Sequence, residues 1–133
     1  MYTFIFLCLA FVLDRIFDSE GKTFIWSIDG LFQHVIALKY IRQYIINLFT
    51  KGSFPMVDFS LGQGFDVIGT LNYYGFGDPV TLFTVLFPEN AMELMYEILI
   101  FVRMYLSGLF VAYLLRTLGK TKTSTILPAC ILY

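Results

Sequence analysis

Charged side chains are scarce in this sequence: they make up 14% of its 133 residues, whereas soluble domains carry about 25%. Nine basic and ten acidic residues give a net charge of −1, so the basic surface that nucleic-acid binding requires is missing. The only two cysteines, Cys8 and Cys130, lack the close spacing of a zinc or redox motif. These shortages argue against a nucleic-acid partner and against a disulfide scaffold.

Apolar and aromatic residues take the place of the missing charges. Hydrophobic residues account for 58% of the chain and aromatic residues for 19%, and the mean hydropathy is +0.74. Soluble domains contain roughly 45–50% apolar residues. The composition therefore indicates a membrane protein.

One segment, residues 93–118, is long enough for a helix to cross a bilayer, which takes about 20 apolar residues. Residues 1–13 and 124–133 are also apolar, but each is too short to span. We expect them to be parts of a first and a third transmembrane helix, so that the chain is a fragment of a larger multi-pass protein.

The charges beside these segments predict their orientation. Arg116, Lys120 and Lys122 follow the long span without an acidic residue, and such short basic connectors face the cytoplasm. We therefore expect residues 119–123 to be cytoplasmic and residues 14–92 to form a large extracytoplasmic loop.

The first part of this loop has the pattern of an amphipathic helix over about residues 29–49. Apolar residues recur at steps of three and four, which is the helical period. A helix of this kind suits the interface plane of a bilayer. The residues on its apolar side are Leu31, Val35, Leu38, Ile41, Ile45 and Leu48.

Asp29 stands at the start of the predicted helix, and two interpretations of it are open. Its carboxylate can cap the helix by accepting backbone N–H groups of the first turn. Alternatively, it is a catalytic carboxylate at the membrane surface, one turn from Gln33 and His34. The two roles are compatible.

The second part of the loop is rich in glycine and resembles a series of tight turns. Its aspartates, Asp58, Asp66 and Asp78, are either ligands of a hard cation or local hydrogen-bond acceptors in turns, and we predict the second. Tyr73 and Tyr74 are either anchors in the membrane interface or walls of a sugar-binding pocket.

Arg103 lies inside the long apolar span, where a charge is costly unless it is paired or reaches water. A guanidinium grips phosphate with two hydrogen bonds, so an anionic lipid phosphate is one suitable partner. The alternative is that the side chain extends to a nearby interface.

Several motifs in order resemble the bacterial YfhO family of multi-spanning membrane proteins. The resemblance covers nearly the whole chain. The segments that carry it are Gly21-Lys22-Thr23-Phe24-Ile25-Trp26, Asp29-Gly30, Gln33-His34, Phe54-Pro55-Met56-Val57-Asp58-Phe59, Leu61-Gly62-Gln63-Gly64, Tyr73-Tyr74, Gly77-Asp78-Pro79, Leu86-Phe87-Pro88 and Arg103-Met104-Tyr105-Leu106-Ser107-Gly108-Leu109.

This resemblance implies an all-α, polytopic fold like that of the GT-C glycosyltransferases, with interfacial helices in a large first extracytoplasmic loop. In that class an acidic residue early in the loop is catalytic, and Asp29 matches it. The implied donor is a sugar on polyprenyl phosphate, and the implied acceptor is a cell-envelope polymer such as lipoteichoic acid. We expect no resident cofactor, and no activity from this portion alone. The expected substrate-binding residues are Gln33, His34, Tyr73, Tyr74, Asp78 and Arg103.

A non-catalytic membrane protein is the alternative, either a transporter segment or a structural partner in envelope assembly. Transporters place charges near the membrane midplane and contain internal repeats. This sequence has no evident repeat, and most of its polar residues lie in the loop, which favours the enzyme.

Overall fold

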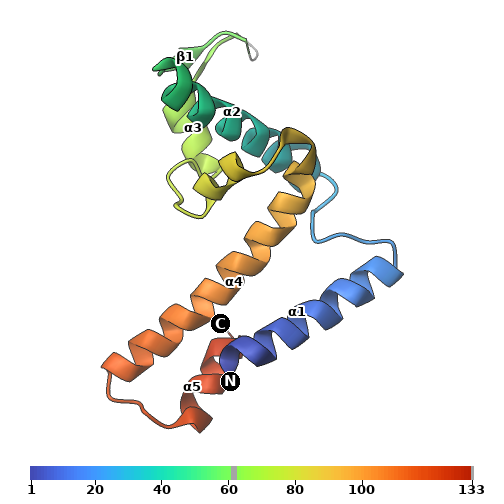
Figure 1. Ribbon diagram of the computed structural model, residues 1–133, viewed down its shortest axis with the longest axis vertical. Helices are drawn as coiled ribbons and strands as arrows, with labels where there is room; N and C mark the ends of the chain where they lie inside the picture. Colours follow the sequence, from blue (N-terminus) through green and yellow to red (C-terminus); the bar gives the residue numbers. More distant parts are fainter. Residues whose placement is uncertain (61–62, 133) are drawn as a thin grey trace. The chain divides into compact units, whose positions relative to one another are not determined.

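The computed structural model describes residues 1–60 and 63–132, so Leu61 and Gly62 of the glycine-rich motif, and Tyr133, lie outside the described residues. The described chain is mainly helical (Figure 1), which is consistent with the predicted all-α class. Its α-helices are α1 (Tyr2–Ser19), α2 (Val35–Lys51), α3 (Val67–Tyr73), α4 (Met92–Thr117) and α5 (Thr123–Leu132).

Shorter elements connect these helices. A π-helical turn, Gly30–His34, leads into α2, and 3-10 helices cover Thr81–Leu86 and Glu89–Ala91. Strands β1 (Val57–Asp58) and β2 (Phe65–Asp66) pair antiparallel, with Val57 opposite Asp66. The chain divides into unit 1, Met1–Phe24 with Ile98–Tyr133, and unit 2, Ile25–Glu97.

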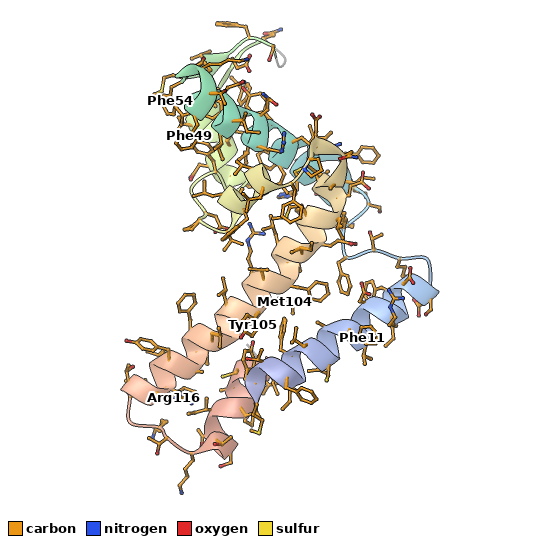
Figure 2. All side chains as sticks on the ribbon, viewed as in Figure 1. Phe11, Phe49, Phe54, Met104, Tyr105 and Arg116 are labelled. Carbon is orange, nitrogen blue, oxygen red and sulfur yellow. The ribbon has the colours of Figure 1, made fainter. Side chains whose placement is uncertain are left out.

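Within unit 1, the start of α1 packs against α4 and α5. The Tyr2 ring stacks on the Tyr105 ring, with centroids 5.6 Å apart, and the Tyr2 hydroxyl donates to the Tyr105 carbonyl at 3.2 Å. The Thr3 hydroxyl lies 2.9 Å from the Tyr105 hydroxyl. Tyr105 therefore joins α1 to the middle of α4, where Figure 2 labels it.

Helix α1 differs from the prediction because it continues beyond Leu13 to Ser19. Arg15 forms ion pairs with Asp14 at 2.9 Å and with Asp18 at 3.4 Å on the exposed side of the helix. Exposed charges at this spacing are compatible with a helix backbone. The first charges therefore end the apolar run without ending the helix.

The segment Glu89–Thr117 is the one helical stretch among residues 1–60 and 63–132 that is long and apolar enough to cross a membrane. It contains the predicted span, residues 93–118, except for Leu118, because α4 ends at Thr117. α5 is apolar but shorter, and Gly119, with a positive φ of 78°, lies in the connector before it.

Unit 2 is organised around α2, whose buried face confirms the predicted helical periodicity. The buried residues of this face pack against other parts of unit 2, and the placement of the helix at the membrane interface stays a prediction. Phe32, Ile36 and Phe49 are exposed, with Phe49 82% exposed at the end of α2 (Figure 2). The central cluster consists of Ile41, Tyr44, Ile45, Val67 and Leu71.

Asp66 holds α3 in place by capping its first turn. Its carboxylate accepts the N–H groups of Ile68 at 3.1 Å and Gly69 at 3.2 Å. Losing an N-cap costs about 1 kcal/mol. We expect Asp66→Ala to speed hydrogen exchange of the α3 amides about fivefold. Thr70→Ala, at an exposed position of the same helix, is the control, and equal exchange in both variants would contradict the capping role.

Candidate active site

The half-buried Asp29 begins the helical segment that leads into α2, but its carboxylate does not cap the backbone. It accepts a hydrogen bond from the Gln33 side-chain amide, with Nε2 and Oδ1 2.8 Å apart. The capping interpretation is therefore wrong for this structure. The side chain of Gln33 orients the carboxylate.

The turn that brings Gln33 to Asp29 is π-helical. The Leu31 N–H donates to the Trp26 carbonyl at 3.0 Å, five residues back, which is the π pattern. Gly30 is buried here, and a Cβ on it would lie 3.0 Å from the Cγ2 atom of Ile25. A side chain at this position would therefore crowd Ile25. Single π turns occur frequently at functional sites.

Aromatic side chains from α3 and its C-terminal end meet the other face of this turn. The Tyr74 hydroxyl donates to Gln33 Oε1 at 3.3 Å, which extends the hydrogen-bonded chain from Asp29. The Tyr74 ring lies edge-on to the His34 ring at 5.3 Å, and the Tyr73 ring lies 6.2 Å from His34. Tyr73 and Tyr74 are perpendicular to each other at 5.0 Å.

Tyr96, in the first part of α4, completes this arrangement, with its ring 6.1 Å from that of His34. Tyr96 was not among the predicted site residues, because nothing in the sequence distinguishes it from the other aromatic residues of the apolar span. We call the whole set the carboxylate–tyrosine cluster. Its members are Asp29, Gln33, His34, Tyr73, Tyr74 and Tyr96.

Five of the seven predicted site residues belong to this cluster: Asp29, Gln33, His34, Tyr73 and Tyr74. Asp78 lies in the turn after α3, where its carboxylate accepts the Val80 N–H at 2.8 Å. Arg103 lies on the part of α4 that belongs to unit 1. The candidate site in unit 2 is therefore the carboxylate–tyrosine cluster.

The aspartates of the glycine-rich part act as hydrogen-bond acceptors, mostly for backbone N–H groups two or three residues away. Asp58 accepts the Tyr40 hydroxyl and the Ser60 N–H, and Asp66 caps α3. The part of the chain that the structure describes contains no group of three or more metal-ligating side chains.

The chemistry available in the carboxylate–tyrosine cluster suits a hydroxylated substrate. An oriented carboxylate accepts a hydrogen bond from a hydroxyl group, and it can take the proton if that oxygen attacks. Tyr73, which is 75% exposed, offers an accessible ring in the same cluster. Aromatic rings with a polar end bind the apolar faces and the hydroxyl groups of amphipathic ligands.

Comparison with known proteins identifies the family. The family model described as bacterial membrane protein YfhO matches residues 1–133, which is the whole sequence. No curated protein and no solved structure matches the chain.

Proposed function

We propose that this chain, which belongs to the YfhO family of bacterial membrane proteins, supplies the catalytic base of an integral membrane glycosyltransferase. The proposed donor is a sugar on polyprenyl phosphate, and the acceptor is a cell-envelope polymer such as lipoteichoic acid. The observation that supports it best is the Asp29 carboxylate, which Gln33 orients at 2.8 Å in a cluster that also contains the exposed ring of Tyr73.

In this mechanism Asp29 acts on the acceptor. Its carboxylate accepts the proton of an acceptor hydroxyl while that oxygen forms a bond to the anomeric carbon of the donor sugar. The bond from this carbon to the phosphate oxygen breaks, and polyprenyl phosphate leaves with the electron pair. Gln33 keeps the carboxylate in position, while His34, Tyr73 and Tyr74 contact the sugar.

The proposal also specifies a membrane arrangement. The chain is part of a multi-pass protein, and residues 14–92 lie on the extracytoplasmic side, where envelope polymers are modified. Cysteines introduced at exposed positions such as Ser53 provide a test, because a thiol reagent that does not cross the membrane should label them in intact cells. Labelling only after the cells are opened would contradict this orientation.

Transfer of radiolabelled sugar from a polyprenyl-phosphate donor is the direct assay, performed in proteoliposomes with the complete multi-pass protein of which this chain is proposed to be a part. Label in the acceptor polymer supports the glycosyltransferase. Failure to transfer from every polyprenyl-phosphate sugar supplied, by protein that is folded and inserted, favours a structural or transport role instead. A parallel reaction with a chelator measures any need for a divalent cation, and we expect none.

A separate hypothesis is that Arg103 binds the phosphate of the lipid donor, since a guanidinium is suited to this group. We expect Arg103→Ala to raise the KM for the donor about 10- to 100-fold, because hydrogen bonds to charged groups contribute about 1.5–3 kcal/mol. Arg116→Ala, at the end of α4 that leads into α5 (Figure 2), is the matched control. Unchanged donor kinetics in the Arg103 variant would remove this residue from donor binding.

A further inference from the structure

A cavity lined mainly by polar residues lies in unit 2, beside the C-terminal half of α2. It has a volume of about 130 Å³. Its helical wall is formed by residues three or four positions apart, which share one side of a helix. The segment from the end of α2 to β1 forms the opposite wall. We call this cavity the α2 pocket, and its lining residues are Tyr40, Gln43, Tyr44, Asn47, Ser53, Pro55 and Asp58.

Hydrogen bonds fix the walls of the α2 pocket. Asp58 accepts the Tyr40 hydroxyl, and the Tyr44 hydroxyl donates to the Pro55 carbonyl at 3.0 Å. On the exposed side of α2, the Gln43 amide donates to Asn47 Oδ1 at 3.1 Å. The pocket is therefore held in shape without a ligand.

The Asp58 carboxylate stays ionised in this setting. Its hydrogen bonds from Tyr40 and Ser60 lower its pKa below the usual value. Hydrogen bonding to the charged form has this effect. At neutral pH the pocket therefore contains a fixed acceptor that still has lone pairs for further hydroxyl donors.

The lining selects one class of ligand. No lysine, arginine or histidine is among the described residues that line the pocket, so an anionic group would meet Asp58 without a compensating cation. Amides, hydroxyls and a carboxylate together with tyrosine rings are instead suited to hydroxyl-rich molecules, which offer several donors and acceptors together. The volume is suited to one small ring.

We propose that the α2 pocket is a saccharide-binding subsite that takes one neutral sugar unit, apart from the carboxylate–tyrosine cluster. Asp58 accepts hydroxyl donors of the sugar, and Gln43 and Asn47 bind its neighbouring hydroxyl groups from the helix. Assigning this unit to the acceptor polymer rests on the proposed function, but the binding of a sugar does not.

The test is direct binding by the full chain in lipid nanodiscs, measured by saturation-transfer NMR. The probes are neutral methyl hexosides and methyl N-acetylhexosaminides, with glycerol 1-phosphate as the anionic comparison. We expect saturable binding of at least one neutral sugar and none of glycerol 1-phosphate. We also expect Asn47→Ala to weaken this binding about fivefold, since one hydrogen bond contributes about 1 kcal/mol.

A further variant separates the subsite from a general effect on folding. Asn72→Ala changes an exposed amide on α3, outside the pocket, and should leave sugar binding unchanged. The binding measurement uses neither a polyprenyl-phosphate donor nor transfer, so a failed transfer reaction does not affect this test. Absence of saturable binding to every neutral probe, or equal binding by wild type and a folded Asn47→Ala variant, would overturn the proposal.

Discussion

Replacing Asp29 with asparagine is expected to lower the rate of sugar transfer by about 10²- to 10⁴-fold, the usual contribution of a general base. The amide has nearly the same shape as the carboxylate, and its oxygen still accepts the Gln33 hydrogen bond that is 2.8 Å long in the native chain. What it loses is the ability to take a proton. The amount of protein in the membrane and its melting temperature should therefore stay close to those of the wild type.

The matched control for this change is Glu89→Gln, which also converts an exposed carboxylate of unit 2 to an amide. This variant should retain the wild-type rate. Gln33→Ala provides an intermediate case, because Asp29 keeps its charge but loses the side chain that orients it. We expect a smaller loss in rate, of about tenfold. Full activity of Asp29→Asn in the donor assay would refute its role as the base.

Replacing Gly108 with leucine is expected to have the largest effect on the stability of unit 1. Gly108 is buried on α4, and a Cβ at this position would lie 2.7 Å from the carbonyl oxygen of Cys130 and still closer to the Tyr2 hydroxyl. Small residues allow helices to approach closely in membranes. The larger side chain would separate α4 from both neighbours and break the hydrogen bond from Tyr2 to Tyr105.

Overpacking of this kind costs about 1–3 kcal/mol. The expected result is a lower melting temperature of the purified protein in detergent, together with reduced accumulation in the membrane. Phe110→Leu introduces leucine at an exposed position of the same helix, 68% exposed in the native chain, and should change neither quantity. A melting temperature in Gly108→Leu equal to that of Phe110→Leu would show that the contact with α1 and α5 is not close in solution.

The sequence predicted helices better than it predicted their partners. The periodicity of residues 29–49 correctly identified the buried side of α2, because residues on one side of a helix recur every three or four positions. Periodicity does not reveal what covers that side. Val67 and Leu71 of α3 do so here, and the glycine-rich segment around α3 gave little sign of a helix.

The candidate site was partly predictable for the same reason. Asp29, Gln33 and His34 are close in the sequence, so a single helical turn is enough to bring them together. Their meeting with Tyr74 depends on the way α3 packs against α2, and no local pattern encodes that contact. Tyr96 was unpredictable because it is one aromatic residue among many in a long apolar segment.

The length of α2 has a consequence for the size of molecules that could use both of its ends. This helix is continuous from Val35, next to the carboxylate–tyrosine cluster, to Asn47 at the α2 pocket. At about 1.5 Å per residue these positions are about 18 Å apart. A monosaccharide is too short to reach from one to the other. Only an extended oligomer can occupy both at once. The length of α2 therefore sets a minimum length for a saccharide chain that binds at both places.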